Sequence, residues 1–338
     1  MVIGYALFLT VVEGNRTQVA ALFLAVALVI LIGCLLEDYA GLRPISDEVR
    51  KVLYSRGVYE NDLRDLMFYN RIRPKFFASE PSSVTFCYTL FTFIWLVVSQ
   101  WRFKMPVFLA LVGAGLFAMP GPTLLLMVLL ILPYMLFLAS RVGGRLSGIR
   151  VARVVFVSAI CLVVFAVAAQ VLFADRLRQT SAGNDPSFFY RVQGPALTAL
   201  YVAHHYPLAG TGLTGEPFIE QQVINVYVRS ASFSSGWQIL SPATELLINY
   251  FWLHWIYLGV LWGTAIMLAL TLWLRVLGAP SPAFCWVVWA ILGQSSGAYV
   301  GPKCWAVMFL AAAAAVLNQR PAQGTVDHSR YRTPRASA

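Results

Sequence analysis

The chain has 338 residues, of which 59% are hydrophobic and only 12% are charged, and its formal net charge is +10. A soluble domain usually has about 25% charged residues, so the composition is that of a membrane protein and excludes an ordinary soluble enzyme domain. Its five cysteines lie in or beside apolar runs and lack the spacing of a metal site. We interpret them as small buried hydrophobic residues and expect no metal.

Apolar runs that approach the length of a membrane span recur along the chain, and a spanning helix needs about 20 residues. The expected membrane-spanning helices are, in chain order, 17–36, 84–99, 105–118, 121–139, 152–173, 246–274, 281–299 and 303–318. Residues 1–12 are apolar but short, which favours an interfacial segment or the end of a longer helix. We therefore predict an all-α fold, a single integral membrane domain over 1–338 that forms a polytopic bundle of about 8 to 10 transmembrane helices.

The positive charges are concentrated in one set of connections between these helices. Cytoplasmic loops of membrane proteins are enriched in Lys and Arg. If the short turns, the basic loop from Arg141 to Arg153 and the tail 319–338 are cytoplasmic, that side has 12 Lys and Arg against 2 acidic residues. The loops 37–83 and 174–245 then face the periplasm, and they have 12 Lys and Arg against 13 acidic residues. The net charge therefore indicates the topology of a multi-pass protein of the bacterial inner membrane, and not nucleic-acid binding.

The first periplasmic loop ends in RIRPKFFASEP, residues 71–81, directly before an apolar run. Arg71, Arg73 and Lys75 would lie at the depth of the lipid headgroups, where an arginine fork suits phosphate oxygens. Phe77 would contact the lipid chain or the face of a sugar. The alternative is ordinary anchoring of the loop at the membrane surface by cationic and aromatic side chains.

The second periplasmic loop contains FFYRVQGPALTALYVAHHYPLAGTGLTG, residues 188–215. An arginine precedes an apolar, helix-like stripe, two histidines follow the stripe, and a glycine-rich turn comes next. These positions are Arg191, His204, His205, Gly210 and Gly212. A neutral imidazole beside a sugar hydroxyl can act as a general base, and the alternative is a hydrogen-bonded polar residue without a catalytic role. No strand is expected before the glycines, so a dinucleotide site is not predicted.

Together, RPKFFASEPSS before a membrane helix and HHYPLAGTGLTG in a large outer loop resemble the O-antigen ligase/polymerase superfamily. The resemblance covers 71–90 and 188–275. It implies a GT-C-like, multi-helix glycosyltransferase of the inner membrane that uses undecaprenyl-diphosphate-linked glycans. It also implies that the enzyme needs no metal or other cofactor.

By position, Arg73 and Arg191 match the two arginines of the family, and Glu80 matches its Glu-Pro element. Gly210 and Gly212 match its glycine-rich turn. The resemblance implies that the two arginines stabilise the charge that develops on the leaving diphosphate.

The resemblance assigns the base less directly, because the family histidine immediately precedes the proline and Tyr206 occupies that place here. We rank the candidates for the base as His205, then His204, then Glu80. The His-Asn element of the family is also absent. A single displacement would invert the anomeric carbon.

The resemblance implies a cell-surface polysaccharide polymerase that joins lipid-linked repeat units, with donor and acceptor glycans and membrane lipid as partners. A chain-length regulator or an export complex would be a further partner. One alternative is a ligase that transfers a finished glycan to another acceptor. Two alternatives from other classes are a transporter of lipid-linked sugars and a structural subunit of an export complex.

Overall fold

The computed structural model describes residues 1–54, 62–139, 188–229, 242–295 and 297–320, with scattered positions between 152 and 178. Within these residues all regular structure is helical and no strand occurs, so the predicted all-α class is confirmed. The basic loop from 140 to 151, ten of the 22 positions of the span expected at 152–173, and the tail beyond Arg320 lie outside the described residues.

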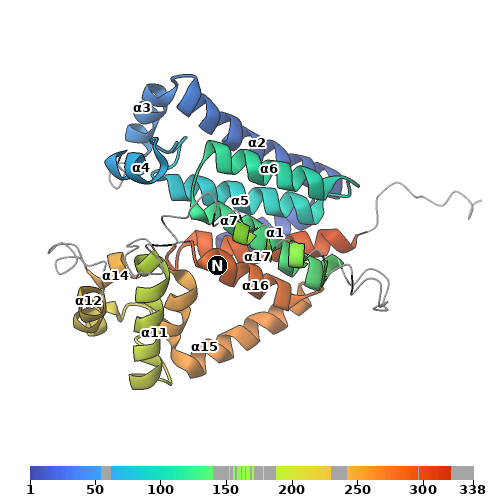
Figure 1. The fold of residues 1–338 in the computed structure, drawn as a ribbon. Coiled ribbons are helices and arrows are strands. Elements are labelled where there is room, and N and C mark those ends of the chain that lie inside the picture. The colour runs from blue at the N-terminus through green and yellow to red at the C-terminus, as the bar shows by residue number, and fades with distance from the viewer. Residues whose placement is uncertain are drawn as a thin grey trace, which may run out of the picture.

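The helices are, in chain order, α1 (Val2–Glu13), α2 (Arg16–Tyr39), α3 (Arg43–Leu53), α4 (Asp62–Tyr69), α5 (Pro81–Val98), α6 (Lys104–Ala118), η1 (Pro122–Leu124), α7 (Leu125–Pro133), η2 (Tyr134–Leu138), η4 (Phe189–Gln193), α11 (Gly194–His205), η5 (Glu216–Ile219), α12 (Glu220–Val228), α14 (Ala243–Leu246), α15 (Tyr250–Val276), α16 (Pro282–Gly293) and α17 (Pro302–Gln319) (Figure 1). Three of them, α2, α5 and α15, are long and apolar enough to cross a membrane. Four of the shorter apolar helices, α1, α6, α7 with η2, and α16, also coincide with runs that the sequence marked as apolar.

Helix α17 lies at the centre of the bundle, with α1, α5 and α16 packed against it (Figure 1). The side chains of Ala311–Ala315 are fully buried. Small side chains allow close approach of helices, which is a common device where helices pack in a membrane. Helices α1 and α17 also approach closely at Gly4, because a Cβ there would lie 2.9 Å from the Trp305 carbonyl carbon. The short apolar segment at the start of the chain is therefore a helix that packs along α17.

The ends of the helices meet at two opposite ends of the bundle. Arg16 at the start of α2 donates to the carbonyl oxygens of Val98 (2.8 Å) and Asn318 (3.0 Å), which end α5 and α17. Helix α2 therefore runs antiparallel to α5 and α17. Arg320 donates to the carbonyl oxygen of Val12, and Lys104 donates to that of Ser99 (2.8 Å). Three cations that the charge pattern assigned to one side, Arg16, Lys104 and Arg320, thus lie at one end, which we call the Arg16 end.

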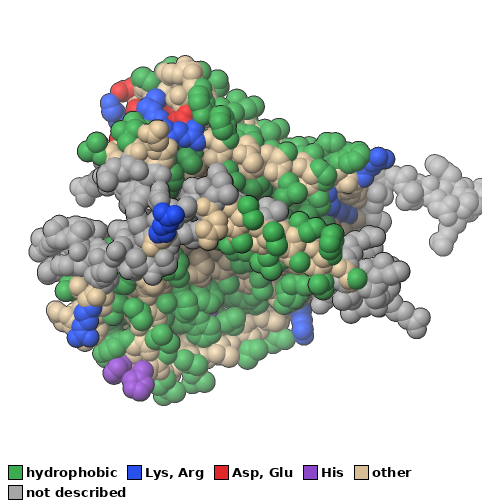
Figure 2. All heavy atoms as spheres, viewed as in Figure 1, with side chains coloured by type: hydrophobic (Ala, Val, Ile, Leu, Met, Phe, Trp, Pro, Cys, Tyr) green, Lys and Arg blue, Asp and Glu red, His purple; other side chains and the backbone are tan. Residues whose placement is uncertain are grey.

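The surface between the two ends is mostly apolar. Figure 2 shows hydrophobic side chains over most of the visible described surface, with acidic side chains gathered over α3 and α4. Large apolar side chains such as Leu22, Val29 and Leu268 are more than half exposed on the long helices. Such a surface is stable next to lipid and is rare on soluble monomers.

Helix α15 is broken at Gly259, whose φ of 65° and ψ of −172° leave the helical region. The turn that follows α11 fits into this break. Its carbonyl oxygens accept from amides of the second half of α15, and its amides donate to carbonyl oxygens of the first half. These bonds are Val260 to Pro207 (2.8 Å), Trp262 to Leu208 (3.3 Å), Thr211 to Ile256 (2.9 Å) and Gly212 to Tyr257 (2.9 Å). The apolar run expected as one continuous helix over 246–274 is therefore two helices joined by a break.

Candidate functional site

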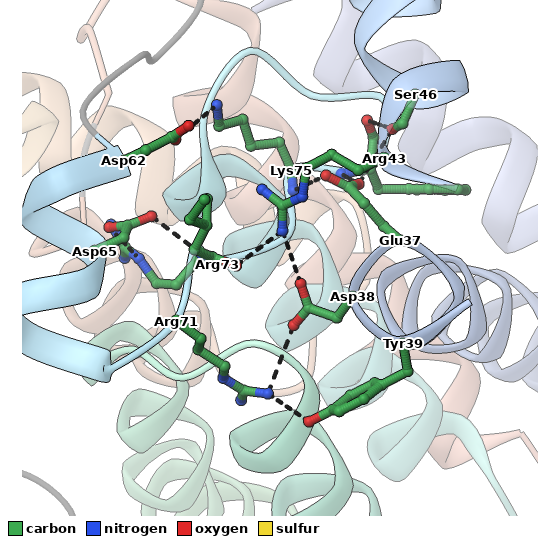
Figure 3. A network of polar contacts seen from close by, with 12 residues as sticks. Glu37, Asp38, Tyr39, Arg43, Ser46, Asp62, Asp65, Arg71, Arg73 and Lys75 are labelled. Carbon is green, nitrogen blue, oxygen red and sulfur yellow. Dashed lines mark hydrogen bonds and ion pairs between the residues drawn. The ribbon is translucent and has the colours of Figure 1, made fainter. Parts of the chain in front are cut away.

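Each cation that the sequence analysis assigned to phosphate binding in the first loop is held by an acidic residue of α2 or α4 (Figure 3). The pairs are Arg71 with Asp38 at 3.5 Å, Arg73 with Asp65 at 2.7 Å, and Lys75 with Asp62 at 3.6 Å. Asp38 lies between Arg71 and Arg43, which it contacts at 2.9 Å. The first loop is therefore folded back onto the ends of the helices that precede it.

A buried ion pair fixes the course of this loop. The side chains of Glu37 on α2 and Arg50 on α3 are both 1% exposed and lie 3.3 Å apart. Glu37 accepts the backbone N–H groups of Lys75 (3.2 Å) and Phe76 (2.5 Å), and Arg50 donates to the carbonyl oxygen of Phe76. Phe76 has a positive φ of 47°, an uncommon conformation that persists where the surroundings enforce it. Its ring packs where Gly33 leaves space.

Ten charged residues lie where α2 ends and the first loop folds back, and we call them the loop network. Its five cations are Arg43, Arg50, Arg71, Arg73 and Lys75, and its five acids are Glu37, Asp38, Asp47, Asp62 and Asp65. The network is balanced in charge, so an anion that binds to its cations must compete with carboxylates already in contact. The geometry favours a positioning role for most of the network.

Arg73 has the most constrained position of the three loop cations. Its Nε donates to Asp65 Oδ1 at 2.9 Å, and its backbone N–H donates to Asp65 Oδ2 at 3.2 Å. Asp65 is fully buried, and the Arg73 guanidinium lies 4.6 Å from the centre of the Tyr69 ring. Asp65 and Tyr69 thus fix the plane of the guanidinium, as the bidentate geometry of arginine requires.

A second group of charges lies where α5 and α17 begin. Lys303, in the first turn of α17, places its Nζ 3.9 Å from the centre of the Phe86 ring on α5. Glu80 lies directly before α5 and Arg191 lies in η4, and their charges influence the pKa of Lys303 less than its burial does. We call Glu80, Arg191 and Lys303 the helix-start cluster. It has two positive charges and one negative charge.

The start of α15 adjoins the same cluster through Asn249. The Asn249 Nδ2 donates to the carbonyl oxygen of Arg191 at 2.6 Å, and its Oδ1 caps α15 by accepting the N–H of Phe251 at 3.0 Å. Gly297, which donates to the Ile248 carbonyl oxygen at 2.7 Å, lies beside the stem of Lys303. The N-termini of α5, α15 and α17 therefore gather here. Helix N-termini have a partial positive charge and favour anions.

The two histidines lie away from this cluster. His204 and His205 are exposed at the end of α11, where Figure 2 shows histidine side chains, and the His205 ring stacks on Tyr201 at 4.0 Å. His205 Nδ1 lies 2.9 Å from the carbonyl oxygen of Tyr201. Fourteen positions of helix separate His205 from Arg191, which is about 20 Å along the axis. The structure brings Glu80 and Arg191 toward Lys303 and does not bring the histidines there.

The remaining predicted substrate-binding residues have mixed surroundings. Gly210 and Gly212 have positive φ values of 59° and 81° and belong to the turn that fills the break in α15. The amides and carbonyl groups of that turn form hydrogen bonds with the backbone of α15. Phe77 is 44% exposed and lies against Phe76 with ring centres 4.2 Å apart. Of these three residues, Phe77 offers the most surface to a ligand.

Sequence reasoning missed three residues that shape the site. Glu37 and Arg50 are not close in sequence to the loop that they hold, and no motif marks them. Lys303 is the first residue of the span expected at 303–318, and no motif marks it. No group of three or more His, Cys, Asp or Glu side chains within the described segments is arranged to hold a metal ion.

Comparison of the chain with models of protein families, with curated proteins and with solved structures found no match.

Proposed function

We propose that the chain is a cell-surface polysaccharide polymerase that joins undecaprenyl-diphosphate-linked repeat units at the periplasmic face of the bacterial inner membrane. The observation that supports this proposal most is the helix-start cluster of Glu80, Arg191 and Lys303. It brings two cations, one carboxylate and three helix N-termini to one end of an apolar bundle. That combination suits the diphosphate of a lipid whose chain lies in the membrane.

The proposal includes the finer topology of the chain. About 8 to 10 transmembrane helices, in a GT-C-like arrangement, would place the loops 37–83 and 174–245 in the periplasm. The separation of the Arg16 end from the loop network supports this topology. The cations at the Arg16 end would then be cytoplasmic.

In the proposed reaction an acceptor hydroxyl attacks the anomeric carbon of the donor sugar. The new bond joins the acceptor oxygen to that carbon, the bond from carbon to the diphosphate oxygen breaks, and undecaprenyl diphosphate leaves. Arg191 and Arg73 stabilise the charge on the leaving diphosphate, and Asp65 holds Arg73 in its orientation. Removal of one such preorganised contact typically lowers the rate by about 10²–10³-fold. One displacement inverts the anomeric carbon.

The proton of the acceptor hydroxyl needs a base close to this bond. Glu80 takes that role in the proposal, ahead of His205 and His204, because Glu80 belongs to the helix-start cluster. The histidines lie about 20 Å from Arg191 along α11. The order of candidates that the sequence suggested is thereby changed.

A gel of surface glycans from cells that lack the gene tests the function. Complementation with the wild-type chain is expected to restore a ladder of glycan lengths, and a well-inserted Arg191→Ala variant is expected to fail. Polymer that accumulates on its lipid carrier in the deletion strain would identify a ligase instead. An unchanged ladder in the deletion strain would contradict both enzyme functions.

One observation favours a second candidate, a transporter of lipid-linked sugars. Broken membrane helices with a buried ionisable residue are typical of transporters. The break in α15 has His254 nearby, 1% exposed, with Nε2 at 3.1 Å from the Gly263 carbonyl oxygen. However, the turn 207–212 already binds the backbone groups released by the break. A transporter would move lipid-linked sugar without forming a glycosidic bond, which the gel distinguishes.

A further inference from the structure

We infer that the turn after α11 is embedded in the outer leaflet of the membrane, where its exposed side chains contact the hydrocarbon chains of the lipid. We call residues 206–213, YPLAGTGL, the turn segment. This inference goes beyond the proposed function. It requires that α15 crosses the membrane with Arg275 on the cytoplasmic side, and it does not require that the chain forms a glycosidic bond.

The first argument is the chemistry of the exposed surface of the turn segment. Its exposed residues are Tyr206, Pro207, Leu208, Ala209, Gly212 and Leu213. The leucines are 65% and 52% exposed, and residues 192–215 contain no Asp, Glu, Lys or Arg. Connections that face water are usually rich in polar residues, and a large exposed apolar patch marks a contact surface. The turn segment therefore suits apolar surroundings.

The charge that follows the turn segment points into the protein. Glu216 is only 6% exposed, and its carboxylate accepts a hydrogen bond from the hydroxyl of Tyr257 on α15. A charged group next to hydrocarbon is costly unless it turns inward and finds a hydrogen-bond partner. The surface becomes polar at α12, which exposes Gln221 and Asn225. The apolar surface thus ends where α12 begins.

The second argument is the backbone of the turn segment. Irregular backbone at membrane depth is tolerated only where the protein binds its polar groups. The carbonyl oxygens of Pro207 and Leu208 accept from amides of α15, and the amides of Thr211 and Gly212 donate to its carbonyl oxygens. The Thr211 hydroxyl also points inward, 3.3 Å from the Ile256 carbonyl oxygen. The turn segment therefore directs polar groups inward and apolar side chains outward, as a re-entrant membrane segment must.

The third argument is depth and continuity with α15. The part of α15 after the break, 260–276, is about 25 Å long, and the hydrocarbon core is about 30 Å thick. With Arg275 at the cytoplasmic boundary, Gly259 lies in the outer leaflet or at its edge. Figure 1 shows the end of α11 beside the bend of α15. Leu208 accepts a hydrogen bond from the N–H of Trp262, which is 56% exposed, so the turn segment continues the lipid-facing surface of α15. This continuity favours lipid over a soluble protein as the partner.

The inference changes the surroundings of the two histidines. His204 and His205 directly precede the turn segment and are exposed. They would lie at the depth of the lipid headgroups, which suits side chains with an apolar body and a polar tip. The loop 174–245, which the charge pattern assigned as a whole to the periplasm, would then have one segment within the membrane.

The experiment measures which reagents reach the turn segment in a lipid bilayer. Leu208→Cys and Leu213→Cys, in a full-length chain without the native cysteines, are spin-labelled and reconstituted in liposomes of phosphatidylethanolamine and phosphatidylglycerol. Collisions of the label with oxygen, which concentrates in hydrocarbon, are compared with collisions with a water-soluble nickel chelate. Leu268→Cys, from an exposed position of α15, is the control for lipid, and Gln221→Cys on α12 is the control for water.

We expect the ratio of oxygen to nickel collisions at Leu208 and Leu213 to be several-fold higher than at Gln221 and close to that at Leu268. If one turn variant does not fold, the other decides. A ratio equal to that at Gln221 would place the turn segment in water and overturn the inference. Low collision rates with both reagents would also overturn it, and dipolar broadening between labels would then identify a second copy of the chain as the partner. A Leu268 label that behaves as water-exposed would contradict α15 as a membrane span and, with it, the inference.

Discussion

Gly210, in the turn after α11, and Gly259, in the break of α15, pack backbone against backbone. A Cβ at Gly210 would lie 2.5 Å from the Gly259 nitrogen, and a Cβ at Gly259 would lie 2.5 Å from the Gly210 nitrogen. Both residues also have positive φ values, 59° and 65°. Neither position has room for a side chain, so the glycines are needed for the turn to enter the break.

We therefore expect Gly210→Ala to lower the thermal stability of the purified protein strongly. Gly212→Ala is the control, because Gly212 has a similar φ of 81° but no atom within 4 Å of its Cβ position. That control loses only about 1–2 kcal/mol for a left-handed residue, whereas Gly210→Ala adds a backbone clash. Unfolding midpoints of the two variants in the same detergent test the difference. Equal losses would show that the turn does not pack into α15 as described.

The buried pair of Glu37 and Arg50 gives a second prediction. Glu37→Gln removes one of the two carboxylate charges that contact the buried Arg50, the other being that of Asp47, and weakens the bonds that hold the first loop. Breaking a buried pair by removal of one partner costs about 3–5 kcal/mol. The control is Glu48→Gln, which breaks the exposed pair with Lys51 and is expected to have no measurable effect. Thermal unfolding of both variants is the measurement, and equal midpoints would contradict the role given to Glu37.

Transfer rates of two variants distinguish Glu80 from His205 as the candidate base. Glu80→Gln is expected to lower the rate of glycan transfer by about 10²–10⁴-fold, the usual contribution of a general base. His205→Ala is expected to keep most of the activity, because His205 is exposed and far from Arg191. The rates of purified, folded variants at saturating donor decide between them. Loss of activity in His205→Ala with Glu80→Gln fully active would restore the histidine as the base.

The orientation of the chain can be tested by labelling. Val52, 86% exposed at the end of α3, and Arg102, exposed near the Arg16 end, belong to opposite ends of the bundle. In a background without the native cysteines, Val52→Cys in intact inner-membrane vesicles or cells is expected to react with a membrane-impermeant thiol reagent from the periplasmic side. Arg102→Cys is expected to react only from the cytoplasmic side. Labelling of both from one side would contradict the predicted topology.

Much of the helical framework follows from local sequence. The apolar runs at 17–36 and 84–99 correspond to α2 (Arg16–Tyr39) and α5 (Pro81–Val98), because length and hydropathy alone mark such helices. The break at Gly259 does not follow, because a single glycine in an apolar run gives no sign of it. It depends on a turn near Gly210 that is distant in sequence.

The candidate site is less predictable for a similar reason. Arg191 and Glu80 were identified from their motifs, but the chain's fold decides which charges stand together. Sequence spacing suggested that Arg73 and its neighbours were available to phosphate, whereas Asp65 and the other acids contact them in the structure. Lys303 is remote from both motifs and reaches the cluster only because α17 packs beside α5.

The most direct test of the proposed function is transfer by the purified chain in liposomes that contain one undecaprenyl-diphosphate-linked repeat unit. The proposed function predicts release of undecaprenyl diphosphate together with longer lipid-linked glycans that have an inverted linkage. It also predicts that Arg73→Ala and Arg191→Ala, folded as the wild type is, are each slower by about 10²–10³-fold. Movement of the lipid-linked sugar across the bilayer without any new glycosidic bond would contradict the proposed function and identify a transporter.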